Sequence, residues 1–589
     1  MKYRYFFFFL IWALIGIQGQ SIIPENRLTN FHNVGCEDFT GEVQRVVLAT
    51  DYGLDSTGGS YSDLPLTDLF DQKPENELWQ IVFPAGLYKF ENPMQPPSNI
   101  ILKGQSGAQW VFETEDNEDC ILIRGTMGSP LAYLGEPAER GVDFLQVAAE
   151  ASIKEGDWIK VYDVDSDLIT STWARESTGQ IVQVDGIDTL SDRILLRDPL
   201  RRTFRTSRSA AIRKINPKYR VGIEGLNILR QFKTSGQTSN IEFQNSVHCY
   251  IRCINSEKTN FAHVNVVSSA HISIQQSEFQ SAHGFGGGGQ GYGVVLNFST
   301  SNSEVSNNYF DSLRHSILLQ AGANGNVVGY NYSTRPYWTG VFLPSDAAGD
   351  LVLHGNYPFC NLLEGNIVQN IVIDASHGIN GPDHIFFRNR AELYGIFIDP
   401  FTPSDQQIFI GNEVPRSDLP YGLFSLSGED HIVYGNLHDG EIIPPGTDTL
   451  QQSSMYLDTI PSFYTSKSAW PPIGLPQQMP NLANEVQWRH DNGLGLCREI
   501  DFTYINDEKL SRQLVLSPNP TNGSVFIDVK GDEFIPRYYE LFALSGQMVQ
   551  SGSISPSYRV VIRNAPKGIY YMFILSEDGR VIAKSIVLQ

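Results

Sequence analysis

Two aspartates close two similar apolar phrases of the sequence. Asp374 ends the phrase IVID, and Asp399 ends the phrase IFID. If the two phrases stack as neighbouring strands, their carboxylates repel each other, so the pKa of one rises or a cation bridges the pair. Calcium would suit this bridge because it accepts carboxylate oxygens flexibly. Alternatively, one acid protonates a glycosidic oxygen while the other acts as base or nucleophile, or both belong to a solvated polar ladder.

Side chains that can move protons or offset charge occur near these aspartates in the sequence. They lie in the phrases LRHSILLQ, LHGNYPFCN and DASHGING, and they are Arg314, His315, His354, Tyr357 and His377. We predict a proton carrier at His354 or Tyr357 and a charge neutraliser at Arg314. The alternative for each histidine is a hydrogen-bonded turn residue.

Other polar and aromatic side chains of this region could hold a sugar. Gln320 closes the phrase SILLQ, and three aromatic residues stand beside loops, namely Tyr292, Tyr337 and Trp338. Their rings could stack on sugar faces, and core packing is the alternative for each. The run HGFGGGGQGYG lacks the Lys-Ser/Thr ending of a phosphate loop. We interpret it as a flat turn that lets a coil or a sugar ring approach the backbone.

Six asparagines recur at an almost constant spacing and predict the elements that position these side chains. Most steps are 23 or 24 residues, and the longer step from 331 to 366 contains extra residues around Tyr337–Asp350. A fixed period of this size indicates stacked units that bury each other's apolar faces. The phrases before the asparagines are short and rich in Ile, Val and Phe, so they predict strands. We therefore predict an all-β fold, a right-handed parallel β-helix in which each amide bonds to neighbouring coils. The asparagines are Asn308, Asn331, Asn366, Asn389, Asn412 and Asn436.

The strand before each asparagine strand should face a groove along the solenoid. Five phrases can be aligned, and because side chains alternate along a strand, their penultimate apolar residues point inward and their last residues outward. Coils stack about 4.8 Å apart. The alignment predicts an outer column made of Gln320, His354, Asp374, Asp399 and Ser427.

The first coils carry a resemblance to a known family. The phrases VVLATDYGLDSTGG, IVFPAGLYKF and NIILKGQSG resemble the opening of pectate-lyase-like β-helix proteins, which include polysaccharide lyases and glycoside hydrolases. The usual acidic phrase of the type DGxTDDT is replaced by LDSTGGSYSDLPLTD. The resemblance implies a carbohydrate-active protein that cleaves an extracellular, acidic polysaccharide by lyase or hydrolase chemistry. The alternative is a non-catalytic cell-surface protein that binds glycan or acts in adhesion.

Two absences narrow this chemistry. No lysine occurs between Lys258 and Lys467, which excludes a lysine base on the central coils. The polygalacturonase pattern NTD, DD, GHG and RIK is also missing, with only SHG at 376–378 as a fragment.

Both ends of the chain predict export. Lys2 and Arg4 precede an apolar run from Phe6 to Ile15, which is typical of a secretory signal peptide and too short for a membrane span. The phrases PNPTNG, LFALSGQMV and GIYYMFI over Leu514–Gln589 resemble the C-terminal sorting domain of type IX secretion in Bacteroidetes. That resemblance implies recognition by the type IX machinery and a protein that is secreted or held at the outer-membrane surface. The alternative is an immunoglobulin-like carbohydrate-binding sandwich.

Composition excludes other classes of partner. The chain has 43 basic and 65 acidic residues and a formal net charge of −22, which argues against nucleic-acid binding. No later segment has the length and apolarity of a membrane helix. Cys249 and Cys253 lie four apart on a predicted strand, too far to bond to each other, and we interpret both as core residues.

The predicted organisation has six parts. They are a signal peptide (1–19), an N-terminal cap with the first coils (20–135), a small β-rich insertion (136–215), the parallel β-helix core (216–445), an irregular cover and linker (446–510), and an immunoglobulin-like β-sandwich that forms the sorting domain (511–589).

Overall fold

The computed structural model describes residues 22–589 apart from 115–116, 149–151, 287, 338–348, 462, 465–469, 476–482, 493–494, 496–513, 531–535, 544–547, 555–557, 564 and 577–580. The predicted signal peptide at 1–19 and Trp338 lie outside the described residues. The chain forms two compact units, Met1–Leu496 and Cys497–Gln589.

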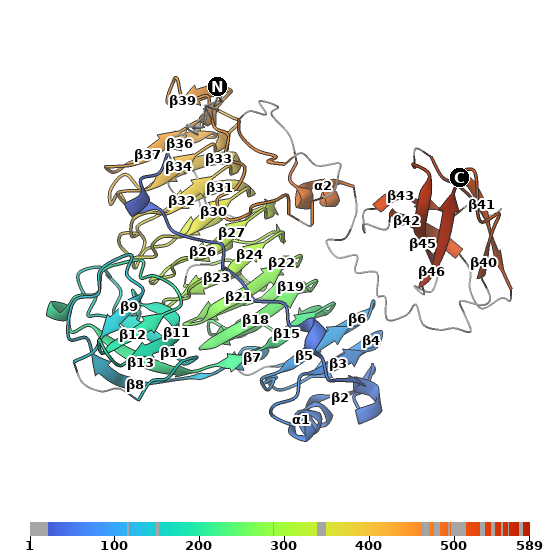
Figure 1. The fold of residues 1–589 in the computed structure, drawn as a ribbon, viewed down its shortest axis with the longest axis horizontal. Coiled ribbons are helices and arrows are strands. Elements are labelled where there is room, and N and C mark those ends of the chain that lie inside the picture. The colour runs from blue at the N-terminus through green and yellow to red at the C-terminus, as the bar shows by residue number, and fades with distance from the viewer. Residues whose placement is uncertain are drawn as a thin grey trace, which may run out of the picture. The chain divides into compact units, whose positions relative to one another are not determined.

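The first unit is a parallel β-helix whose coils stack along one axis (Figure 1). One wall is a parallel sheet whose strands follow each other along the axis. These strands are β1 (Arg45–Leu48), β3 (Trp79–Phe83), β5 (Ile100–Gly104), β15 (Val221–Glu224), β18 (Ser246–Arg252), β21 (Ala270–Gln275), β24 (Glu304–Ser306), β27 (Val327–Gly329), β30 (Leu362–Glu364), β32 (Ile385–Phe387), β34 (Ile408–Ile410) and β37 (Ile432–Tyr434).

The remaining walls belong to a second, mostly parallel sheet. Its first strands are β2 (Thr57–Tyr61), β4 (Gly86–Phe90), β6 (Ala108–Phe112), β7 (Ile121–Arg124), β16 (Asn227–Arg230), β17 (Ile241–Gln244), β19 (Asn255–Thr259), β20 (Ala262–Val267) and β22 (Glu278–Ala282). They are followed by β23 (Tyr292–Asn297), β25 (Tyr309–Asp311), β26 (His315–Leu319), β28 (Tyr332–Thr334), β29 (Leu351–Leu353), β31 (Ile367–Ile373), β33 (Arg390–Ile398), β35 (Glu413–Val414), β36 (Leu423–Ser425), β38 (Asn436–His438) and β39 (Glu441–Ile443).

The predicted asparagine ladder is present between the two sheets. Each side-chain oxygen accepts the backbone N–H of the asparagine one coil earlier, as Asn389 does from Asn366 at 3.2 Å and Asn412 does from Asn389 at 3.0 Å. Each amide nitrogen also donates to a strand carbonyl, as Asn389 does to Leu363 at 2.7 Å. Because these amides are fully buried, their bonds replace those that water would supply and hold consecutive coils in one register.

A second ladder, which the sequence did not predict, runs along the other end of the same strands. Asn326 donates its backbone N–H to the side-chain oxygen of Asn361 at 3.0 Å. Asn361 in turn donates to Nδ1 of His384 at 3.3 Å, so an imidazole continues a row of amides. Burial lowers the pKa of His384 to about 4, which keeps the ring neutral and able to accept.

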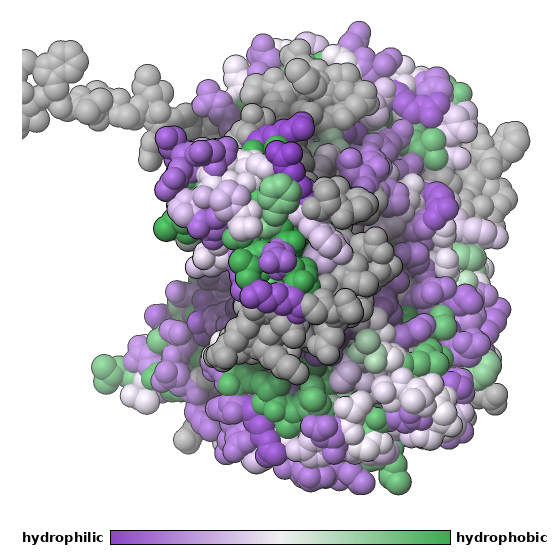
Figure 2. Space-filling model, turned by 90° about the vertical axis from the view of Figure 1, so that its right-hand side faces the viewer, coloured by the Kyte–Doolittle hydropathy of each residue, from purple (hydrophilic) through white to green (hydrophobic). Residues whose placement is uncertain are grey.

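Alternate residues of each strand fill the interior of the coils. Leu319, Leu353, Ile373 and Ile398 are each at most 1% exposed and belong to one continuous core. The rings of Phe386 and Phe409 stack at a centroid distance of 4.7 Å within the same core. On the face drawn in Figure 2 the surface is mostly hydrophilic, and apolar residues gather only in small patches.

An antiparallel sheet interrupts the coils and packs against their side (Figure 1). It has the order β8 (Thr126–Tyr133), β13 (Ala211–Asn216), β10 (Trp158–Tyr162), β11 (Gln180–Asp188), β12 (Arg193–Leu196) and β9 (Phe144–Gln146). It has its own core, in which Leu145, Ile159 and Phe204 are fully buried. We call this part the insertion.

Glycine allows the insertion to approach the coils. Gly322 has a left-handed φ of +72°, and a Cβ at this position would lie 1.9 Å from the carbonyl oxygen of Ser177. The hydroxyl of Ser299 donates to the same carbonyl. Any larger residue at 322 would therefore separate the insertion from the helix.

Short helices occur outside the coils, and the C-terminal unit is a β-sandwich. The helices are α1 (Asp63–Gln72) and α2 (Glu485–Asp491). One sheet contains β40 (Leu514–Ser517), β41 (Ser524–Val529) and β44 (Arg559–Val561), and the other contains β42 (Pro536–Ala543), β43 (Met548–Ser553), β45 (Gly568–Ser576) and β46 (Val581–Leu588). Residues of both sheets share one buried core, as the predicted sandwich requires. Among the described residues, no helix is long and apolar enough to cross a membrane.

One cysteine differs from expectation. Cys249 is buried and free, as predicted, whereas Cys253 is half-buried and disulfide-bonded. The interpretation of Cys253 as a core residue is therefore wrong. It has a left-handed φ of +60° and follows the last residue of β18, so it belongs to a turn rather than to an inward-facing strand position.

The ladder makes a direct prediction about stability. Replacing Asn389 by Ala removes an acceptor of two N–H groups of Asn366 and a donor to Leu363. Leaving these groups buried and unpaired should cost about 3 kcal/mol of stability, measured as a clear fall in the melting temperature of the helix. Asn92→Ala, at an exposed position, is the matched control. Equal melting temperatures for the two variants would contradict a stabilising ladder.

Candidate functional site

The pairing of consecutive strands aligns the outer column that the sequence phrases predict. Leu319 pairs with Leu353, Leu353 with Ile373, and Ile373 with Ile398 in consecutive parallel strands. The residues that follow these partners therefore occupy equivalent positions one coil apart. They are Gln320, His354, Asp374 and Asp399, and the pairing of Phe397 with Ser425 extends the column to Ser427.

His354 and Asp374 form a hydrogen-bonded pair in this column. His354 Nδ1 lies 2.6 Å from Asp374 Oδ2, and the two side chains are 13% and 19% exposed. Burial raises the pKa of Asp374, but the charge and hydrogen bond of His354 and the N–H of Ser376 outweigh it, so this pKa lies below its ordinary value. The ionised carboxylate can only accept, so Nδ1 carries the proton and Nε2 of His354 is the nitrogen that can take one.

Two further histidines surround the pair. The ring of His377 meets that of His354 edge-on at a centroid distance of 5.0 Å, and its Nδ1 lies 3.1 Å from the hydroxyl of Ser171. The ring of His315 lies 5.5 Å from that of His354. His315 donates from Nδ1 to the carbonyl of Gly349 at 2.6 Å, and burial lowers its pKa to about 3.

His315 Nε2 is a buried atom without a hydrogen-bond partner among the residues that the structure describes. Since its Nδ1 must donate to a carbonyl, this nitrogen has a free lone pair. The ring packs against Tyr292 at 4.6 Å. The structure thus brings together three of the predicted residues, His315, His354 and His377, around Asp374.

Asp399 has a different role from the one expected. Its Oδ1 accepts the backbone N–H of Phe401 at 2.7 Å and of Thr402 at 3.2 Å, which closes the turn after β33. Asp374 is paired with His354, which lies one coil earlier and offers a donor. Asp374 and Asp399 thus stay one coil apart in the column, and Asp374 is also paired with His354.

The same bonds bear on the predicted calcium site. Both oxygens of Asp374 and Oδ1 of Asp399 already accept protein donors. In the described part of the chain, no group of three or more His, Cys, Asp and Glu side chains is arranged to hold a metal ion. Carboxylate oxygens have further lone pairs, so calcium binding at Asp374 and Asp399 stays a prediction.

Other predicted residues lie around the histidines or away from them. Arg314 donates to the carbonyl of Gly286 at 2.7 Å and so holds the glycine-rich loop. Tyr337 is 43% exposed, and its ring stacks on Phe285 at 4.0 Å. Gln320 is 9% exposed and stays in the column.

Tyr357 lies at the boundary with the insertion. It has a left-handed φ of +61°, and its backbone N–H donates to Ile379 at 3.0 Å. Burial raises the pKa of its hydroxyl, and the strongest opposing charge comes from Arg202 of the insertion. His354, the other predicted proton carrier, is hydrogen-bonded to Asp374.

The insertion supplies two residues that sequence reasoning missed, Ser171 and Trp173. Both belong to the turn around the short 3-10 helix Thr172–Ala174. Trp173 packs edge-on against His377 at 5.3 Å and Phe298 at 5.7 Å. The oxygen of the Asn356 side chain accepts the N–H of Ser171 at 3.1 Å. Their distance along the chain from Asp374 hides this contact, and the phrase STWA carries no local signal of it.

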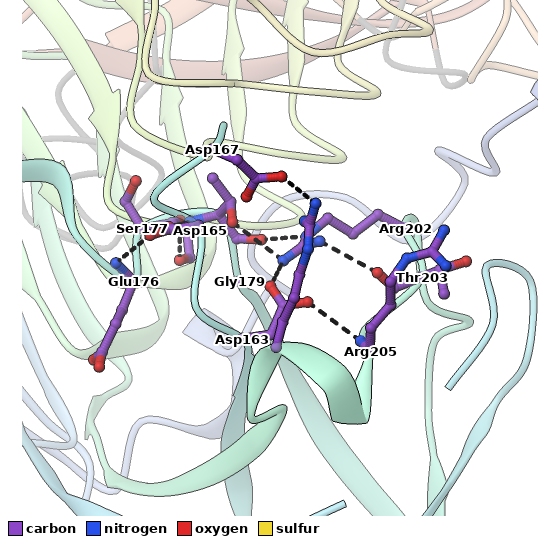
Figure 3. Close-up of polar contacts among 12 residues, drawn as sticks. Asp163, Asp165, Asp167, Glu176, Ser177, Gly179, Arg202, Thr203 and Arg205 are labelled. Carbon is purple, nitrogen blue, oxygen red and sulfur yellow. Dashed lines mark hydrogen bonds and ion pairs between the residues drawn. The ribbon is translucent and has the colours of Figure 1, made fainter. Parts of the chain in front are cut away.

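Figure 3 shows how this turn is held at its base. The Asp165 carboxylate accepts the backbone N–H of Glu176 at 2.9 Å and of Thr178 at 3.1 Å, closing the segment between them. Arg202 and Arg208 pair with Asp163 and Asp167 respectively. These bonds hold the two ends of the segment 163–179 together.

Comparison with known proteins supports the fold and the identity of the tail. Residues 516–589 match the family described as Secretion system C-terminal sorting domain. The tailspike gp61 of Pseudomonas phage phi297 has a similar structure, with a TM-score of 0.50 and 13% identity over 67% of this chain and 75% of that chain. This likeness shows the β-helix fold alone.

Two further tailspikes are more distant. The tailspike gp49 of Pseudomonas phage LKA1 has a TM-score of 0.41 and 13% identity over 65% of this chain and 79% of that chain. The Gp54 tailspike of Acinetobacter baumannii bacteriophage AP22, solved with a capsular saccharide, has a TM-score of 0.35 and 12% identity over 67% of this chain and 68% of that chain. No curated protein matches the chain.

The lowered pKa of Asp374 predicts a pH-dependent stability. A carboxyl whose folded pKa lies below the ordinary 3.8 stabilises the folded state above that pH, and this contribution is lost as the pH falls through the folded pKa. Asp374→Asn should therefore lower the melting temperature at pH 6, and the gap to the original protein should narrow near pH 3. Asp448→Asn, at an exposed position, controls for the loss of one charge. A gap of the same size at both pH values would contradict the pairing with His354.

Proposed function

We propose that this protein is an exported enzyme that cleaves an extracellular, acidic polysaccharide on the groove face of its β-helix. The observation that carries the proposal is the bond of 2.6 Å between His354 and Asp374. It orients an imidazole on the outer column with Nδ1 toward the carboxylate, which leaves Nε2 as the nitrogen that can act as a general base. The sorting domain at 516–589 supports contact with extracellular material.

The geometry favours proton abstraction over hydrolysis by two carboxylates. Such hydrolysis needs one carboxylic acid that stays protonated to donate to the leaving oxygen. The pKa of Asp374 lies below its ordinary value, so this group stays ionised, and Asp399 is held in a turn. The pair that remains is a base oriented by a carboxylate. This chemistry suits a lyase.

The lyase step can be written with the residues on the groove face. His354 Nε2 takes the proton from the ring carbon next to the uronate carboxyl group, and the electron pair of that C–H bond forms a carbon–carbon double bond. The glycosidic carbon–oxygen bond on the neighbouring carbon breaks at the same time. The leaving oxygen takes a proton from water. Arg314, which adjoins His315, is a cation that could offset the uronate charge at this end of the site.

A second candidate is a glycan-binding protein without turnover. The exposed ring of Tyr337 and that of Trp173, 45% exposed beside the histidines, favour it because such rings hold sugars without any chemistry. Binding and cleavage are distinguished by product formation alone.

The test is an activity screen of the exported protein against pectins, alginates and glycosaminoglycans. Absorbance near 235 nm and reducing ends are followed together, with calcium and with a chelator. A lyase produces both signals, a hydrolase produces reducing ends alone, and a binding protein produces neither. Loss of activity with chelator would support the calcium site, and unchanged activity would remove calcium from the account.

His354 provides the sharpest variant. His354→Gln keeps a polar side chain but removes the base and the imidazole bond to Asp374, so the cleavage rate should fall about 10²–10⁴-fold, whereas Asp374→Asn sets the scale of the accompanying fall in melting temperature. His32→Gln, at an exposed position before the first coil, is the matched control and should keep full activity. A His354→Gln variant that retains the original rate would remove the pair from the mechanism.

A further inference from the structure

The insertion contributes a half-exposed aromatic side chain, Trp173, which packs against His377. Trp173 is 45% exposed, although its neighbour Ala174 is fully buried and donates its N–H to Ser171 at 3.0 Å. A large indole that is half-exposed on a fixed turn loses little freedom when it binds a ligand. Trp173 therefore has a fixed backbone and a half-exposed indole ring.

The turn is fixed to the β-helix on several sides. The Asn356 side-chain oxygen accepts the N–H groups of Thr170 and Ser171, both at 3.1 Å. Gly378 has a φ of +83°, and a Cβ there would lie 2.7 Å from the Thr170 side chain. The Thr170 side chain can thus pack against the backbone at 378 only because that position has no side chain, so the turn contacts the coil of His377.

Trp173 lies close to the histidine–aspartate pair, with His377 between them. Phe298 follows the last residue of β23, and His377 follows β31, so the two rings against which Trp173 packs lie on coils to either side of Gln320 and His354. The ring of His377 contacts both Trp173 and His354, at 5.3 and 5.0 Å. A sugar residue on the indole would therefore be a close neighbour of a sugar residue held at His354.

We infer that Trp173 is a sugar-stacking subsite, on which a pyranose ring of the polymer lies next to the residue whose bond is attacked. The ligand class follows from the chemistry, because the apolar face of a pyranose covers an indole while its hydroxyl groups remain free for polar neighbours such as Ser171. The inference rests on the proposed function for its location, but it concerns binding and can be tested without turnover.

The variants for the test are made in the full exported chain. Trp173→Ala removes the platform, and Trp173→Phe keeps an aromatic face if the alanine variant fails to fold. Tyr133→Ala is the matched control, because Tyr133 is 57% exposed on β8 of the same insertion. Retention is measured by electrophoresis through gels that contain pectin, alginate, hyaluronan or xylan, and KM and kcat are measured on any polymer that is cleaved.

The expected result is that Trp173→Ala loses about tenfold in affinity, with KM raised and kcat nearly kept. Trp173→Phe should lie between, and Tyr133→Ala should match the original protein. Equal retention of Trp173→Ala and the original protein would overturn the subsite, as would a lack of retention of the original protein on every gel.

The two proposals fail in different ways. If His354→Gln abolishes turnover while Trp173→Ala binds normally, the proposed function stands and the subsite falls. If Trp173→Ala loses retention while no polymer is cleaved, the subsite stands and the enzyme falls.

Discussion

The central coils depend on a buried amide in each of them, from Asn308 to Asn436. A buried asparagine must find partners for both ends of its side chain, and here each finds them on adjacent coils. The ladder accepts coils of different length, since Asn331 and Asn366 are 35 residues apart and still form both bonds. It therefore fixes the position at which each of these coils aligns with the next.

The ladder also aligns the strand ends that carry the candidate site. Once coils share a register, equivalent strand ends align, and His354 and Asp374 come within 2.6 Å although they belong to different coils. The insertion then packs against the coils, where Gly322 leaves room for the carbonyl of Ser177 and Gly378 for the side chain of Thr170. The candidate site is therefore formed by equivalent positions of stacked coils together with one turn of the insertion.

The sequence predicts the repeating part better than the rest. Periodicity identified the ladder, the strands and the alignment of the outer column, because these follow from spacing alone. It did not choose His354 as the partner of Asp374 over Asp399, since that depends on which side chain leans over the groove. It also missed Trp173, because nothing in a sequence without relatives connects a turn of the insertion to a coil so far along the chain.

The most direct test of the central claim is a crystal structure of the His354→Gln variant soaked with an acidic oligosaccharide. We expect a sugar chain along the groove face. The ring carbon that carries a uronate carboxyl group should lie about 3.5 Å from the side chain at position 354. Ordered sugar elsewhere on the β-helix, with no density over His377 and Asp374, would contradict it.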